Sequence, residues 1–232
     1  MQTCAVPPFV IEHALSWDRR WQPHDLLRLH HLEMPDDEPQ WVREAFARAP
    51  VAVVRRALAA DGFVAIGVRG VERAQRYGTW ARVADIATAV PPEALAQSIP
   101  LAARGDLPAF IAFTELRNDM AGPLHDFIWG PAGSAGFELA TQVPTVNASS
   151  DLDLLIRTPE SLTRERALAL LNQLQTHAKT AGIRVDAQLD TPAGGVALAE
   201  WATDKPRVMA RRASGPQRIA DPWAVVHCGE LA

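Results

Sequence analysis

Two aspartates, Asp151 and Asp153, lie one residue apart in the apolar run Ser150-Asp151-Leu152-Asp153-Leu154-Leu155. In an extended strand, residues i and i+2 point to the same face, so both carboxylates would project together while Leu152 and Leu154 enter the core. Neighbouring carboxylates repel each other, and they stay ionised mainly where divalent cations neutralise their charge. The pair therefore indicates phosphoryl transfer assisted by metal ions.

A glycine-serine pair, Gly133-Ser134, precedes Ser150 by sixteen residues and is expected to form a tight turn into a helix. Backbone N–H groups at such a helix start bind phosphate oxygens, and the Ser134 hydroxyl would add a further contact. Serine is also a common helix N-cap, and Ser134 could serve in that way. Both roles are compatible at this position.

A third carboxylate is expected on a later strand, where Ile183 to Leu189 alternates apolar residues with Arg184, Asp186 and Gln188. The polar face of that strand therefore presents Asp186, which would complete the acidic site. Asp190 lies on the same face four residues later and competes for this role, although the following Thr191-Pro192 favours a turn there. The sequence leaves the choice between Asp186 and Asp190 open.

Several expected elements would position these side chains. Thr163 to Ala181 has apolar residues at helical spacing, with Thr163 as the cap and Gly182 as the stop. The other elements expected around the acidic site are a strand over Leu124 to Trp129, a short helix over Gly133 to Ala140, and strands over Asp151 to Ile156 and Ile183 to Leu189.

The first third of the chain has a different pattern. Gln40 to Ala49 predicts a helix, and two β-like runs follow it, Val51 to Arg55 and Phe63 to Val68. Consecutive prolines then interrupt the chain near residue 91. We therefore expect an α+β protein with a small N-terminal module, 1–91, and a second module, 92–232, that contains the acidic site.

Composition excludes several classes of protein. The net charge of −4 argues against general binding of nucleic acid, which needs a positive surface. No apolar run approaches the roughly 18 to 20 residues that span a membrane, and residues 1–12 lack the features of a signal peptide. We therefore expect a cytoplasmic protein with no membrane partner, in which the two cysteines, Cys4 and Cys228, form no disulfide.

The order of strand, glycine-serine turn, Asp-x-Asp strand, helix and later strand with a third Asp resembles the polymerase-β-like nucleotidyltransferase superfamily. More particularly, Trp129 to Thr141 together with Ser150 to Leu155 resembles the malonate decarboxylase holo-acyl-carrier-protein synthases, which are phosphoribosyl-dephospho-CoA transferases. Pro23-His24-Asp25-Leu26-Leu27 resembles the opening motif of the same family. Within it, we expect His24 and Asp25 to serve as a cap or to make a structural hydrogen bond, and to take no part in catalysis.

The resemblance implies a nucleotidyltransferase-like mixed sheet flanked by helices, and a reaction. The phosphoribosyl-dephospho-CoA part of 2'-(5-triphosphoribosyl)-3'-dephospho-CoA is joined to a serine of the malonate decarboxylase acyl carrier protein, and pyrophosphate leaves. It also implies that Asp151 and Asp153 bind Mg²⁺, with two ions in the site, and that Asp186 completes the site and helps to deprotonate the serine. The Gly133 turn and Ser134 would hold the departing phosphates.

Two basic groups are candidate binding residues. Arg69, Arg73 and Arg76 follow a predicted strand and could bind a phosphate of the CoA part, or form a solvated basic face. The second group lies near the C-terminus and comprises Lys205, Arg207, Arg211 and Arg212. An acidic carrier protein could dock on it, or its charges could serve only solubility.

Two other functions use the same residues. A nucleotidyltransferase that moves AMP or another NMP to a protein or small-molecule hydroxyl would have the same three aspartates, because pocket shape sets the donor and acceptor. A non-catalytic module that only binds a carrier protein is the third hypothesis. The presence of all three carboxylates argues against it.

Overall fold

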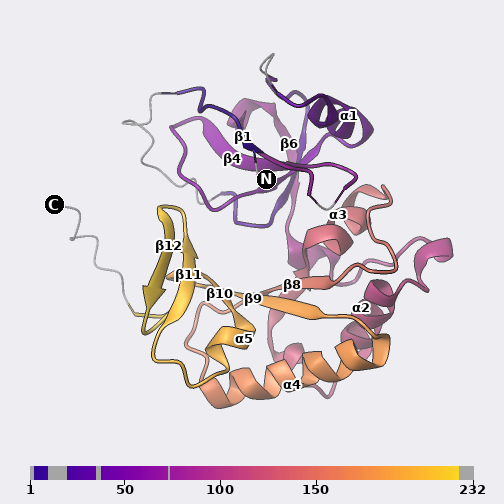
Figure 1. The fold of residues 1–232 in the computed structure, drawn as a ribbon, viewed down its shortest axis with the longest axis vertical. Helices are drawn as coiled ribbons and strands as arrows, with labels where there is room; N and C mark the ends of the chain where they lie inside the picture. Colours follow the sequence, from indigo (N-terminus) through magenta and orange to yellow (C-terminus); the bar gives the residue numbers. More distant parts are fainter. Residues whose placement is uncertain (1–2, 10–19, 35–37, 73, 225–232) are drawn as a thin grey trace.

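A computed structural model describes residues 3–9, 20–34, 38–72 and 74–224 of the chain. These residues form two six-stranded β-sheets with α-helices packed on them (Figure 1). The first sheet has the strand order β1-β5-β4-β3-β2-β6, and the second has the order β12-β11-β10-β9-β8-β7. The α+β class predicted from the sequence is confirmed.

The first sheet is antiparallel apart from the short β1–β5 pair. Its core contains Leu27, Ile66 and the helical Val42, all of them fully buried. The elements of this part are β1 (Thr3–Cys4), β2 (Leu26–Leu29), α1 (Gln40–Arg48), β3 (Val51–Val54), β4 (Phe63–Arg69), β5 (Arg76–Arg82), the 3-10 turn η2 (Val83–Asp85) and β6 (Ile86–Val90).

The second sheet is antiparallel except for the pair β8 and β9, which runs parallel. Parallel neighbours need a crossover, and the helix α4 supplies it. The elements are β7 (Ile128–Pro131), α3 (Gly133–Thr141), β8 (Leu152–Arg157), α4 (Arg164–Ala181), β9 (Val185–Thr191), β10 (Gly194–Ala197), α5 (Leu198–Trp201), β11 (Val208–Arg212) and β12 (Gly215–Ile219).

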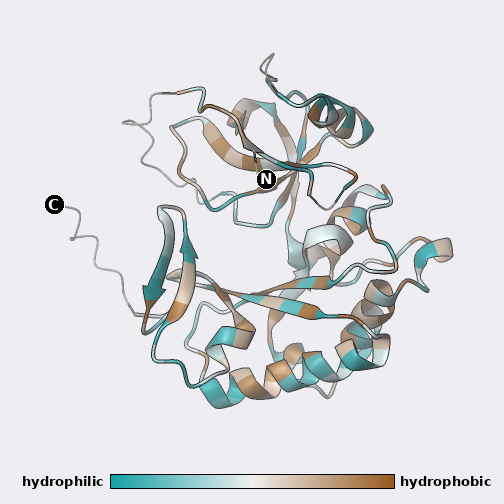
Figure 2. Ribbon diagram, viewed as in Figure 1, coloured by the Kyte–Doolittle hydropathy of each residue, from teal (hydrophilic) through white to brown (hydrophobic). Residues whose placement is uncertain are grey.

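The helix α4 has the caps that its sequence predicts. The Thr163 hydroxyl accepts a hydrogen bond from the Arg166 N–H at 3.2 Å, and Gly182 ends the helix in the left-handed conformation. Hydrophilic and hydrophobic residues alternate along it (Figure 2). Leu170 and Leu174 lie on its buried side, and each contributes about 1.5–3 kcal/mol by leaving water.

The segment that joins the two sheets was only partly predictable. The strand predicted to begin at Leu124 begins at Ile128, because Pro123 instead opens a 3-10 turn, η5 (Pro123–Asp126). The buried helix α2 (Pro108–Asn118), which begins at a proline, has no counterpart among the predicted elements. Two shorter 3-10 turns precede it, η3 (Pro92–Leu95) and η4 (Ala102–Arg104).

The two faces of the second sheet have different neighbours. In Figure 1, α2, α4 and α5 cover one face, and the first sheet lies on the other side. Side chains of β8 and β9 that point away from these helices therefore face the N-terminal part of the chain. No helix in the described ranges is both long and apolar enough to cross a membrane.

Candidate active site

Asp151, Asp153 and Asp186 come together at one end of the parallel β8–β9 pair. Asp153 and Asp186 are direct partners in the register of the two strands. One nitrogen of Arg184, Nη2, lies 3.0 Å from Asp151 Oδ2 and 3.0 Å from Asp186 Oδ2. Arg184 was not singled out from the sequence, although its position two residues before Asp186 on the same strand face is a usable signal.

Helix α3 begins directly beside Asp153. The Ala132 N–H donates to the Asp153 carbonyl at 2.8 Å, and Gly133 follows with a φ of +57°. A Cβ on Gly133 would lie 1.9 Å from Asp153 Oδ2, so only glycine leaves room for this carboxylate. Ala132 is the N-cap and Ser134 lies buried inside the first turn, so Ser134 is not the cap. Its contact with phosphate stays a prediction.

Burial and charged neighbours of both signs act on the pKa of Asp153. Burial raises its pKa above the ordinary value, and the negative charges of Asp186 and Asp151 act in the same direction. The positive charges of Arg76 and Arg69 act in the opposite direction and lower this pKa. The two arginines are register partners at the ends of β4 and β5. Arg69 and Arg76 thus lie within electrostatic range of Asp153, while Arg73 lies outside the described residues.

The donor atoms of the acidic group decide which cation it could hold. No three His, Cys, Asp or Glu side chains within the described ranges are arranged to hold a metal ion. The Arg184 guanidinium, however, already supplies a positive charge between Asp151 and Asp186. All of the available donors are carboxylate oxygens, the ligands that Mg²⁺ prefers. The carboxylates are thus of the right chemical type for a hard cation, but Arg184 occupies the place between Asp151 and Asp186 in this structure, and binding of Mg²⁺ there stays a prediction.

Asp190, the competing third carboxylate, has different partners. Its Oδ1 accepts from Arg56 Nη2 at 2.5 Å and its Oδ2 from Arg157 Nη1 at 2.8 Å. Arg157 also pairs with Asp25 and Glu93, at 3.4 and 3.1 Å. Two arginines thus compensate the charge of Asp190, and its register partner on β8 is Arg157 rather than Asp153. This geometry favours Asp186 as the third member of the acidic group.

His24 lies in the same polar contact between the first and second sheets. Burial, followed by the charge of Arg56, lowers its pKa from 6.5 to about 4. The neutral ring accepts a hydrogen bond at Nε2 from Gln188 Nε2, at 2.8 Å. Asp25 accepts from the Gln22 N–H in addition to its pairing with Arg157. Both His24 and Asp25 therefore make structural hydrogen bonds, one of the two roles expected from the sequence.

The lowered pKa of His24 makes stability depend on pH. The unfolded chain takes up this proton near pH 6.5 and the folded chain only near pH 4, so stability is lost as the pH falls between these values. The loss should reach at most about 3 kcal/mol. We expect His24→Gln to flatten this part of the stability profile, measured by urea unfolding at pH 7, 6, 5 and 4. The exposed His31→Gln is the control, and equal profiles in both variants would contradict the assignment.

The buried Glu138 of α3 fixes the loop that leads to Asp151. Its carboxylate accepts hydrogen bonds from Arg104 and from the N–H groups of Thr145 and Val146, the last two at 2.7 and 2.8 Å. Burial acts to raise the pKa of Glu138, but these hydrogen bonds outweigh it, so the pKa lies below its ordinary value. Glu138 therefore contributes stability that is present at neutral pH and lost as the pH falls through its folded pKa.

We expect Glu138→Gln to lower the free energy of unfolding by about 3 kcal/mol, because it leaves Arg104 without its charged partner in a mostly buried site. Chemical denaturation at pH 7 measures this change. Glu33→Gln is the matched control, since it removes an exposed ion pair with Arg82 and should cost less than about 1 kcal/mol. Similar costs for the two variants would show that the Glu138 network does not hold the loop.

The four basic residues near the C-terminus have separate surroundings. Lys205, Arg207 and Arg211 are exposed. Arg211 donates to the Gln188 side chain at 3.0 Å, and the half-buried Arg212 donates through Nε to the Ala193 carbonyl at 3.0 Å. Docking of a carrier protein on this group stays a prediction, in which Lys205 and Arg207 have the most accessible charges.

Comparison with known proteins finds one family over most of the chain. Residues 22–92 match the phosphoribosyl-dephospho-CoA transferase MdcG N-terminal domain, and residues 94–222 match the MdcG C-terminal domain. A phosphoribosyl-dephospho-CoA transferase of Pseudomonas aeruginosa is 44% identical over 88% of this chain and 94% of its own length. Proteins of the same name from Pseudomonas fluorescens and Azotobacter vinelandii are 43% and 40% identical over 88% of this chain, and over 94% and 95% of their own lengths. No solved structure matches.

Proposed function

The chain belongs to the phosphoribosyl-dephospho-CoA transferase MdcG family, and from this we propose that it attaches the prosthetic group of malonate decarboxylase. The donor is 2'-(5-triphosphoribosyl)-3'-dephospho-CoA, and the acceptor is a serine of the acyl carrier protein. One observation of the structure supports this proposal most directly. Three carboxylates lie beside the start of α3, and two arginines of the first sheet direct positive charge toward them.

The proposed reaction is an in-line displacement at phosphorus. The serine oxygen forms a bond to the α-phosphorus, the bond from that phosphorus to the oxygen that bridges to the β-phosphorus breaks, and pyrophosphate leaves. Asp186 accepts the proton of the serine. The product is a phosphodiester between the carrier serine and the phosphoribosyl group, so the reaction needs no oxidant or reductant.

The protein groups have separate roles in this proposal. Asp151 and Asp153, with Asp186, would hold two Mg²⁺ ions, which supply charge compensation for the attacking and leaving oxygens. The N–H groups at the start of α3 and the Ser134 hydroxyl bind the departing phosphates. Arg69 and Arg76 bind a phosphate of the CoA part and keep the anionic donor beside the carboxylates.

Intact-mass spectrometry of the apo carrier subunit tests the reaction. The subunit is incubated with this protein, Mg²⁺ and the triphosphoribosyl donor, and ATP replaces the donor in a parallel sample. We expect the carrier to gain the mass of one phosphoribosyl-dephospho-CoA group. Addition of AMP in the ATP sample alone would support a nucleotidyltransferase that uses ATP, and no change in either sample would contradict both reactions.

A further inference from the structure

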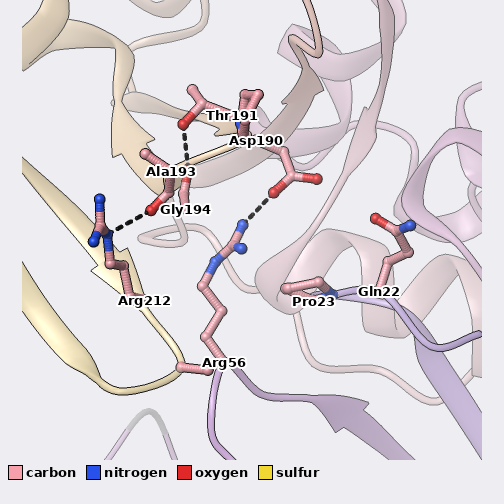
Figure 3. Close-up of a pocket in the computed structure, with 10 residues that line it drawn as sticks. Gln22, Pro23, Arg56, Asp190, Thr191, Ala193, Gly194 and Arg212 are labelled. Carbon is pink, nitrogen blue, oxygen red and sulfur yellow. Dashed lines mark hydrogen bonds and ion pairs between the residues drawn. The ribbon is translucent and has the colours of Figure 1, made fainter. Parts of the chain in front are cut away.

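A cavity of about 390 Å³ lies where loops of the first sheet meet the hairpin turns of the second. Gln22, Pro23 and Arg56 line it from the N-terminal part of the chain. The β9–β10 hairpin contributes residues 190–194, and the β11–β12 hairpin contributes Arg212 and Ala213. Figure 3 shows Arg56 reaching Asp190 and Arg212 reaching the Ala193 carbonyl.

The walls of the cavity combine flat apolar surface with a few polar groups. Pro23, Pro192 and Ala213 supply apolar area, and the planar Arg212 guanidinium can stack on a ring. The Asp190 carboxylate supplies hydrogen-bond acceptors. Each of its oxygens receives one hydrogen bond from an arginine, and because a carboxylate oxygen has about two acceptor sites, each can accept another.

The arginines of the lining already have acceptors within the protein, because Arg56 pairs with Asp190 and Arg212 donates to the Ala193 carbonyl. The Asp190 carboxylate neutralises Arg56 and would repel a second anion at the same place. A neutral aromatic ring with an amino group fits better, because the ring covers the apolar wall and the amino group donates to Asp190. Adenine has this combination, a flat π-face and one exocyclic amine donor.

The position of the cavity relative to the acidic group fits the proposed donor. Asp190 follows Asp186 by four residues on the same face of β9, so the two lie about 13 Å apart by the rise of a strand. In the donor, the reacting phosphorus and the adenine are separated by the phosphoribosyl unit and the ribose of the adenosine. Two linked sugars span a distance of the same order.

We propose that this cavity is the subsite for the adenine ring of the donor, with Asp190 as the acceptor of the exocyclic amine. The assignment rests on the proposed function for the identity of the donor. It also gives Asp190 a role distinct from that of Asp186, in substrate recognition rather than in the acidic group. Recognition of adenine here sets the direction in which the donor lies along β9.

The subsite is tested by calorimetric titration with dephospho-CoA, which carries adenine but has no triphosphate to transfer. Ala213→Trp places a bulky side chain into the cavity from the β11–β12 turn, and we expect it to weaken dephospho-CoA binding by about tenfold or more. Ser214→Trp, at an exposed position of the same turn outside the cavity lining, is the matched control. Two further probes are 4'-phosphopantetheine, which lacks adenosine, and dephospho-CoA with hypoxanthine in place of adenine.

The subsite is supported if Ala213→Trp weakens dephospho-CoA binding selectively, with binding of 4'-phosphopantetheine unchanged and the hypoxanthine analogue bound more weakly by the unaltered protein. Equal losses for dephospho-CoA and 4'-phosphopantetheine would overturn the adenine assignment, as would unchanged affinity in a folded Ala213→Trp protein. The proposed reaction is judged separately by the carrier mass. Selective loss of dephospho-CoA binding without any transfer would retain the subsite and refute the reaction.

Discussion

Asp153→Asn should reduce transfer of the prosthetic group by about a hundredfold to a thousandfold, the scale of losing one group that stabilises charge in the transition state. Asparagine has nearly the same shape but lacks the negative charge that Mg²⁺ needs. The rate is measured from the mass of the carrier under single-turnover conditions. Calorimetric titration with Mg²⁺ in the absence of donor should show weakened binding in the same variant.

The same substitution should leave the fold as stable as before, or more stable. Burial and the neighbouring charges of Asp186 and Asp151 raise the pKa of Asp153. An acid with a raised folded pKa gives its full stability at low pH, and this stability is lost as the pH rises through that pKa. At pH 7 the ionised carboxylate therefore opposes folding, and Asn removes this cost. Loss of activity without loss of stability would show that Asp153 serves catalysis rather than folding.

Asp126→Asn is the control for this experiment, because Asp126 forms an exposed ion pair with Arg166 in another part of the molecule. It should change neither Mg²⁺ affinity nor turnover. If Asp153→Asn transferred the prosthetic group at nearly the unaltered rate, the metal assignment would be wrong. A large drop in thermal stability would instead assign Asp153 a structural role.

The acidic group was predictable because its members depend on local periodicity. Asp151 and Asp153 follow from the two-residue repeat of a strand, and the helix α4 with its caps implies that β8 and β9 are parallel. Parallel pairing then brings Asp186 beside Asp153. Each step uses residues that are close in sequence or joined by one predicted helix.

The contacts between the two sheets were not predictable in this way. Arg56 meets Asp190 across 134 positions of the sequence, and His24 meets Gln188 across 164. No periodicity within either segment specifies which loop of the first sheet lies on which strand of the second. The cavity could not be predicted for the same reason, since its lining comes from four separated segments.

Gly133→Ala should reduce transfer by at least about a hundredfold, because displacement of a reacting group by about 1 Å commonly has an effect of that size. The added methyl would lie 1.9 Å from Asp153 Oδ2, so the carboxylate or the start of α3 must move. Alanine at a φ of +57° also costs about 1–2 kcal/mol of backbone energy. Turnover and the free energy of unfolding must therefore both be measured.

Gly182→Ala separates the two effects. Gly182 has a φ of +69°, and a Cβ placed there meets no atom within 4 Å. It should therefore show a similar backbone cost while transfer continues at the unaltered rate. The difference in turnover between the two variants then reports the contact with Asp153 alone. If both lost the same stability and both kept their activity, the close approach of Gly133 to Asp153 would have no part in catalysis, and the turn would serve only to begin α3.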